Sequence, residues 1–272
     1  MSTGNRIDAR FEQLRTEGRT ALIPFMTAGD PLPDATADLM HALVEGGADL
    51  IELGVPFSDP MADGPVIQKA SERAIARGVR LTDVLDAVQQ FRTRDKETPV
   101  VLMGYLNPVE IHGRERFAAD AAAAGVDGLL MVDSPVEESA SLRALLESHG
   151  LHQILLAAPT TSPERQRQLA QSAGGFLYYV AFAGVTGAAH LDVGAVAQQV
   201  DALRRLGDVP VAVGFGVRDA ASARAVAQHA DAVVVGSALV QHLSGCADVD
   251  TARAAATAFL RGLRVAIDGR DR

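Results

Sequence analysis

Eight short apolar runs recur along the chain, and a stretch with helical spacing follows each of them. Strands that are apolar on both faces and alternate with helices form a parallel sheet covered by helices. Eight such units in 272 residues predict a (β/α)8 TIM barrel of the α/β class. The expected strands cover residues 21–26, 50–53, 100–103, 129–132, 154–158, 176–180, 211–213 and 232–235.

The two ends of the chain add helices to this barrel. Ile7, Phe11 and Leu14 follow the i, i+4, i+7 spacing of an amphipathic helix over residues 6–17. Apolar residues at the other end predict an additional, closing helix over residues 249–267.

Three of the strand entries resemble one another, which favours one repeated unit over two unlike domains. They are Gly47-Ala-Asp49, Gly125-Val-Asp127 and His229-Ala-Asp231. We expect each aspartate to hydrogen bond locally as the chain turns inward. No linker or low-complexity tract separates the units, so residues 1–272 are expected to form a single barrel domain.

Composition and charge exclude several classes of protein. The net charge of −9 argues against nucleic acid binding, and no apolar run reaches the roughly 18 residues that a membrane span needs. The single cysteine, Cys246, excludes internal disulfides and suits a reducing compartment. The first residues lack the apolar segment of a signal peptide. The seven histidines show no metal-binding spacing. We therefore expect a cytoplasmic protein without a metal site.

Two acids stand out at the second strand and its loop. The functional site of such a barrel lies at the carboxyl ends of the strands. Glu52 interrupts the apolar strand 50–53, and Asp63 follows in a loop rich in Pro, Asp and Gly. Because burying a carboxylate is costly, Glu52 is either catalytic or a structural acid held by a neighbouring hydroxyl or cation. Asp63 is either a second functional acid or an ordinary turn residue.

Glycines follow the last two expected strands, at Gly214 and Gly216 and again at Gly236-Ser237. Backbone N–H groups that no side chain covers, next to the start of a helix, form a cradle for anions. Barrels frequently bind phosphate at these two loops. The alternative is that the glycines only allow tight turns.

Two tyrosines and one glycine-flanked segment complete the candidates. Tyr105 and Tyr178 either line a pocket of aromatic size or pack in the core with a solvated hydroxyl. Residues 184–187, Gly-Val-Thr-Gly, form either a lid with glycine hinges or an ordinary surface loop.

Residues 52–68, Glu-Leu-Gly-Val-Pro-Phe-Ser-Asp-Pro-Met-Ala-Asp-Gly-Pro-Val-Ile-Gln, closely resemble the signature of tryptophan synthase alpha subunits. A signature of this length that contains both acids is far more specific than a phosphate loop alone. Further matches occur in the family's order and spacing at residues 24–31, 103–108, 184–187, 214–216 and 236–237. The resemblance runs across essentially the whole chain and includes the extra N-terminal helix.

The resemblance implies a lyase of tryptophan biosynthesis that cleaves indole-3-glycerol phosphate, by a retro-aldol reaction, to indole and glyceraldehyde 3-phosphate. By the match, Glu52 is the general acid/base, which protonates C3 of the indole and helps to deprotonate the side-chain hydroxyl. Asp63 stabilises the positive charge at the indole nitrogen and accepts a proton from it. The chemistry fits the residues, because C–C cleavage beside an electron-rich ring needs a proton donor for carbon and a counter-charge for the nitrogen.

The resemblance also implies the residues that bind the substrate. The indole ring is expected between aromatic side chains, and the phosphate on the glycine-rich loops. The implied set is Phe25, Tyr105, Tyr178, Thr186, Gly187, Gly214, Phe215, Gly216, Gly236 and Ser237.

A partner is implied as well, namely the beta subunit, in a complex of two alpha and two beta subunits. Pyridoxal phosphate is expected only in that partner, so this chain itself should hold no cofactor. The positions that match the interface are Asp59, Pro60, Asn107 and Pro135.

The chain departs from the family's usual residues at Ser134, at residues 181–182 and at residues 188–190, on the expected lid and partner-facing loops. Two alternatives therefore stay open beside a true alpha subunit. One is a stand-alone lyase that releases free indole, and the other is a catalytically silent barrel with a regulatory role. Another phosphate-binding barrel, such as a sugar-phosphate isomerase, would not explain the whole 52–68 loop.

Overall fold

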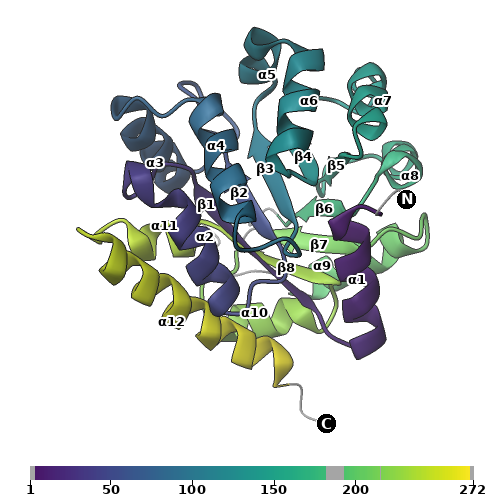
Figure 1. The fold of residues 1–272 in the computed structure, drawn as a ribbon. Coiled ribbons are helices and arrows are strands. Elements are labelled where there is room, and N and C mark those ends of the chain that lie inside the picture. Colours follow the sequence, from purple (N-terminus) through teal and green to yellow (C-terminus); the bar gives the residue numbers. More distant parts are fainter. Residues whose placement is uncertain (1–3, 182–192, 215, 270–272) are drawn as a thin grey trace.

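The computed structural model describes residues 4–181, 193–214 and 216–269. Its strands are all parallel and pair in chain order, and β8 returns to β1, so that the sheet closes into the predicted TIM barrel (Figure 1). Each strand lies within two residues of its expected bounds. The strands are β1 (Ala21–Thr27), β2 (Ile51–Gly54), β3 (Val100–Gly104), β4 (Gly128–Met131), β5 (His152–Ala157), β6 (Leu177–Val180), β7 (Val211–Gly214) and β8 (Ala232–Val235).

Helices surround the barrel, and those at the two ends of the chain agree with the sequence prediction (Figure 1). In the described part of the chain, none is long and apolar enough to cross a membrane. The helices are α1 (Arg6–Glu17), the 3-10 turn η1 (Pro33–Ala35), α2 (Thr36–Glu45), α3 (Pro65–Ala76), α4 (Leu81–Arg92), α5 (Leu106–His112), α6 (Arg114–Ala124), α7 (Ala140–Ser148), α8 (Pro163–Ser172), α9 (Val193–Arg204), α10 (Ala220–Ala227), α11 (Ser237–Leu243) and α12 (Val249–Asp268).

Helix α5 adds to the prediction, which ended the third strand at residue 103 and assigned no helix to residues 103–108. Its first N–H group, on Leu106, donates a hydrogen bond of 2.8 Å to the carboxylate of Asp133. This carboxylate follows β4 and takes the place of a local cap at the helix start. A cap supplied from 27 positions away leaves no local signal in the sequence.

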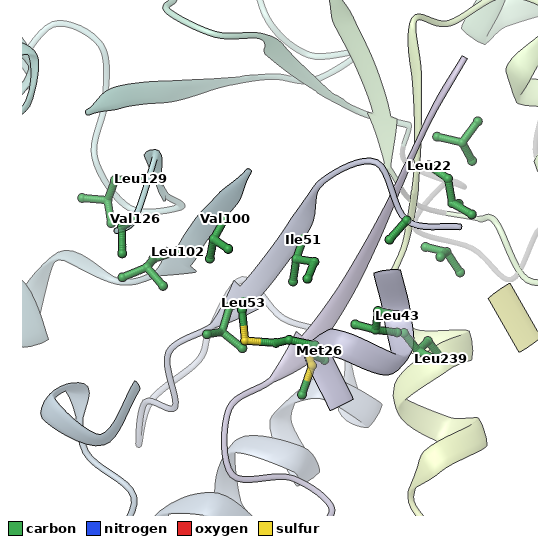
Figure 2. Packing of buried hydrophobic residues seen from close by; sticks show 14 of the residues in the cluster. Leu22, Met26, Leu43, Ile51, Leu53, Val100, Leu102, Val126, Leu129 and Leu239 are labelled. Atoms are coloured by element: carbon green, nitrogen blue, oxygen red, sulfur yellow. The ribbon is translucent and has the colours of Figure 1, made fainter. Parts of the chain in front are cut away.

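Side chains of the strands alternate between two apolar cores. One set points outward against the helices, and Figure 2 shows it with Leu22, Met26 and Ile51 from the strands facing Leu43 of α2 and Leu239 of α11. The other set fills the inside of the barrel. Burial on both faces explains why the strands are apolar throughout, as expected for a parallel sheet.

Helix α1 closes the amino-terminal end of the barrel. Its apolar face, Ile7, Phe11 and Leu14, belongs to the interior core, and the rings of Phe11 and Phe176 lie 5.7 Å apart. A β-carbon at Gly128 would lie 3.0 Å from Ile7, so this glycine lets the helix approach the strand ends closely. With this end filled, the accessible end of the barrel is the one at the carboxyl ends of the strands.

The three aspartates at the similar strand entries do not bond locally, so this expectation was wrong. Each accepts a hydrogen bond from the first or second N–H group of the preceding strand, and each pairs with an arginine. The N–H bonds run from Leu22 to Asp49, from Val100 to Asp127 and from Val211 to Asp231, at 2.8–2.9 Å. The arginines are Arg264, Arg92 and Arg204, respectively. The repeated Asp therefore ties neighbouring strands together at the closed end.

Candidate active site

A cavity of about 480 Å³ opens at the carboxyl ends of the strands, and both Glu52 and Asp63 line it. A larger hollow of about 730 Å³ lies at the opposite end, beside α1. Charged side chains dominate that hollow, among them Arg204, which is paired with Asp231. None of the residues predicted for the site lies there, so the cavity that holds the two acids is the candidate active site.

Strand β2 places Glu52 inside the barrel, beside Phe25 on β1 and Val101 on β3. The residue is 2% exposed, and its Oε2 atom has no hydrogen-bond partner among the described residues. Burial, with a smaller contribution from the nearby Asp63, raises the pKa of Glu52 from 4.5 to about 8. No described cation or hydroxyl bonds to Oε2, and a pKa of about 8 favours the protonated form of Glu52 at neutral pH.

Asp63 reaches the same cavity from the loop between β2 and α3. Tyr105 fixes this loop, because its hydroxyl accepts a hydrogen bond from the N–H of Ala62 at 2.9 Å and donates one to Asp63 at 3.2 Å. Gln68 adds a bond of 2.8 Å from its amide to the Asp63 carbonyl. Burial raises the pKa of Asp63 from 3.8 to about 6, and the bond from Tyr105 opposes that increase. Asp63 is therefore mainly ionised at neutral pH.

The two acids thus differ in protonation state within one cavity. Glu52 is a neutral proton donor on a rigid strand, whereas Asp63 is an anion on a loop held by hydrogen bonds. Pairs of carboxyl groups whose surroundings separate their pKa values divide acid and base roles in enzymes. The arrangement can deliver a proton to one atom of a ligand and stabilise positive charge at another.

The predicted aromatic residues have different positions. Phe25 and Tyr178 line the cavity, and both are largely buried. Burial, together with the nearby Glu52 and Asp63, raises the pKa of Tyr178 well above 10, so its hydroxyl stays protonated. Tyr105 is buried behind the wall, where its ring stacks on Phe57 with centroids 4.9 Å apart. Tyr105 therefore supports the loop that carries Asp63.

The glycine-rich loops contribute Gly216, Gly236 and Ser237 to the lining. Gly216 has a φ of +84°, a conformation that other residues rarely adopt. The following helix α10 is not free to bind an anion at its start, because the Asp219 carboxylate already accepts a hydrogen bond from Ser222 N–H. Helix α11 starts at Ser237 without a side-chain cap.

Gly214 does not line the cavity but lies behind Tyr178, where a β-carbon would overlap the tyrosine ring. Thr186, Gly187 and Phe215, with the expected lid at 184–187, fall outside the described residues.

Sequence reasoning missed the apolar walls and two cations. The walls are formed mainly by strand residues near the carboxyl ends, and the period-2 pattern of the strands is the signal that identifies them. The cations, Arg165 and Arg218, stand on exposed segments that follow β5 and β7, and nothing in the local sequence distinguishes them. The apolar wall residues include Ile67, Met103, Leu130, Val132, Leu156, Val180 and Val234. In the described part of the chain, no group of three or more His, Cys, Asp or Glu residues is placed to hold a metal.

Three of the positions predicted for a partner interface, Asp59, Pro60 and Pro135, lie on loops after the strands, and the fourth, Asn107, lies in the first turn of α5. Asp59, Asn107 and Pro135 are exposed, and Pro60 is half-buried. Two large apolar side chains are exposed on the same segments, namely Met61 at 86% and Ile111 at 79%.

Comparisons with known proteins agree with one family throughout. The family model for the tryptophan synthase alpha chain matches residues 11–267. A tryptophan synthase alpha chain from Xanthomonas oryzae pv. oryzae is 60% identical over 264 residues, which are 97% of this chain and 98% of the relative.

Solved structures show the same likeness. Tryptophan synthase subunit alpha from Legionella pneumophila is 44% identical, with a TM-score of 0.91 over 98% of this chain and 99% of the other. A tryptophan synthase structure from M. tuberculosis in an aminoacrylate-bound form is 37% identical, with a TM-score of 0.86 over 97% and 100% of the two chains. The chain, a TIM barrel with two carboxyl groups in one apolar cavity, belongs to the tryptophan synthase alpha chain family of lyases.

Proposed function

We propose that Glu52 and Asp63 together carry out the reaction of this lyase, the retro-aldol cleavage of indole-3-glycerol phosphate to indole and glyceraldehyde 3-phosphate. The observation that carries the proposal is that both acids line one apolar cavity, with pKa values of about 8 and about 6. In this proposal residues 1–272 act as one domain in the cytoplasm, a setting that the single cysteine fits.

The proposed reaction uses both protonation states. Glu52 donates its proton to C3 of the indole, and Asp63 stabilises the positive charge that develops on the ring nitrogen and accepts its proton. The bond between C3 and the glycerol side chain then breaks, and its electron pair returns to the ring. The side-chain hydroxyl becomes the aldehyde and gives its proton to Glu52, and the ring nitrogen recovers its proton from Asp63. Both acids thereby end in their starting states.

The walls of the cavity fit the two halves of this substrate. Phe25, Tyr178 and the apolar strand ends would hold the indole ring. The loops at Gly216 and Gly236-Ser237 also line the cavity, and their backbone N–H groups would bind the phosphate. Gly187, Phe215 and Gly216 remain predicted members of this phosphate site, whereas Gly214 lies behind Tyr178 and does not line the cavity.

The variant Glu52→Gln tests the proposed roles, because Gln has nearly the same shape but no proton to exchange. Indole formation from indole-3-glycerol phosphate should fall roughly 100- to 10,000-fold. Binding of glycerol 3-phosphate and the circular dichroism spectrum should stay unchanged. Glu97→Gln, an exposed change at the closed end of the barrel, is the matched control. A Glu52→Gln protein with normal turnover would end the proposal, and so would a parent protein that forms no indole.

We also propose that the chain works with a beta subunit, in a complex of two alpha and two beta subunits, and that pyridoxal phosphate belongs to that partner. The exposed Met61 and Ile111, next to Asp59, Pro60, Asn107 and Pro135, support a docking surface around the mouth.

Adding beta subunit should raise the rate of indole formation. Ile111→Glu should weaken that activation while leaving the rate of the chain alone unchanged. Val265→Glu, on the exposed side of α12, is the control with similar exposure. A rate that does not respond to the beta subunit would favour the stand-alone lyase instead.

A further inference from the structure

The charges that line the active-site cavity are divided between its two sides. The acids Glu52 and Asp63 come from β2 and its loop, whereas the basic residues of the described lining are Arg165 and Arg218. Arg165 follows β5 and Arg218 follows β7. In a closed barrel of this strand order, these two positions flank β6, which lies across the mouth from β2.

Arg165 is held in place by its backbone, and the partner of its side chain among the described residues is an exposed carboxylate. Its N–H donates to the Ser162 hydroxyl, which caps α8 at 3.3 Å. Its guanidinium donates to Glu137 at 3.1 Å, and the two side chains are 45% and 48% exposed. Exposed ion pairs contribute little stability, so a second anion can compete for this arginine.

A phosphate group matches the geometry of this guanidinium. Arginine binds phosphate with two parallel hydrogen bonds, and such charge-assisted bonds are roughly twice as strong as neutral ones. The backbone N–H groups at Gly216, Gly236 and Ser237 carry no formal charge, so a dianion in this cavity gains from nearby cations. Arg218 stands two residues beyond Gly216, on the same loop.

We infer that Arg165 and Arg218 bind the phosphate group of the substrate and position it opposite the two acids, with Glu137 competing for Arg165. The inference rests on the proposed function, because it takes the substrate to be a phosphate ester. It adds two residues to the site. It also implies that the ion pair between Arg165 and Glu137 weakens substrate binding.

Single and double neutralisations test this assignment in the full-length chain. Arg165→Gln and Arg218→Gln should each raise the KM for indole-3-glycerol phosphate about tenfold, which corresponds to about 1.4 kcal/mol. The kcat should change less than twofold, because the inference assigns both side chains to the phosphate and neither to a proton transfer. Arg167→Gln, an exposed arginine on the same helix outside the cavity, is the matched control. Glu137→Gln should lower the KM, since it releases Arg165.

Two inhibitors separate a phosphate contact from a general disturbance of the cavity. Inhibition by glycerol 3-phosphate should weaken about tenfold in Arg165→Gln and Arg218→Gln, whereas inhibition by indole should stay unchanged. Unchanged inhibition by glycerol 3-phosphate in the double variant would overturn the inference, as would equal weakening for both inhibitors. A parent protein with no indole formation would contradict the proposed function itself, so the two failures are distinguishable.

Discussion

The ring and hydroxyl of Tyr178 fill the space that a β-carbon would need at Gly214. The two residues lie on neighbouring strands, β6 and β7, and Tyr178 lines the active-site cavity. A glycine at 214 therefore sets the position of a side chain that lines the substrate cavity, although it does not line the cavity itself.

We expect Gly214→Ala to displace Tyr178 into the cavity. Overpacking of this kind costs typically about 1–3 kcal/mol of stability, and the displaced ring should obstruct the ligand as well. Indole formation should fall by at least about tenfold, and thermal unfolding should occur at lower temperature. Gly262→Ala on α12 is the control, since a β-carbon there meets nothing within 4 Å and Ala favours a helix. Normal activity in Gly214→Ala would contradict this account of the pair.

The dependence of kcat/KM on pH should be bell-shaped, with limits near pH 6 and pH 8. Activity falls below pH 6 because Asp63, with a pKa of about 6, becomes protonated. It falls above pH 8 because Glu52, with a pKa of about 8, loses the proton that it must donate.

Tyr105→Phe should move the acid limb of this profile. The Tyr105 hydroxyl lowers the pKa of Asp63 by donating a hydrogen bond to its ionised form. Without it, the acid limb should shift to higher pH by roughly 0.5–1 pH unit, and the alkaline limb should stay in place. Steady-state rates from pH 5 to 9 measure both limbs. A shift of the alkaline limb alone would assign the acid limb to another group.

The barrel and its acids could be predicted because their signals are local. Each strand is an apolar run, and Glu52 is a charge inside such a run, where only a functional need or a buried partner explains it. The cap of α5 could not be predicted, because Asp133 supplies it from another loop. Likewise, the packing role of Gly214 depends on Tyr178, which is 36 positions earlier and adjacent only across two strands.

The aspartates of the strand entries likewise have partners that are distant in the sequence. Asp127 was noticed as part of a repeat, yet its partners Arg6 and Arg92 come from two different helices. Its hydrogen bond to Val100 joins β3 to the entry of β4. The pattern indicated that the residue matters, and only the tertiary structure shows that it connects strands.

Asp127→Ala should be among the most destabilising single changes at the closed end of the barrel. Asp127 is 3% exposed, and its loss removes the nearer of the two carboxylates beside the largely buried Arg92, which keeps only Asp95 at 3.9 Å among the described acids, and leaves Val100 N–H without this acceptor. Breaking a buried pair in this way costs about 3–5 kcal/mol. Glu12→Ala removes the exposed ion pair with Arg15 and should cost less than about 1 kcal/mol. Urea unfolding measures both, and equal effects would contradict the role given to Asp127.

Glu52→Gln should remove most of the turnover and yet stabilise the fold at alkaline pH. The pKa of Glu52 is about 8 in the folded state, above its ordinary value of 4.5. Between pH 4.5 and pH 8 the folded protein therefore keeps a proton that the unfolded chain has released. Stability contributed by the neutral form is complete below pH 4.5 and is lost as pH rises toward 8. Gln carries no charge at any pH, so the variant should gain roughly 2–4 kcal/mol over the parent at pH 8.5 and little at pH 5. Urea unfolding at the two pH values measures the difference, with Glu97→Gln following the parent at both. If the stability difference between Glu52→Gln and the parent is the same at pH 8.5 and at pH 5, the Glu52 carboxyl group titrates normally in the folded barrel.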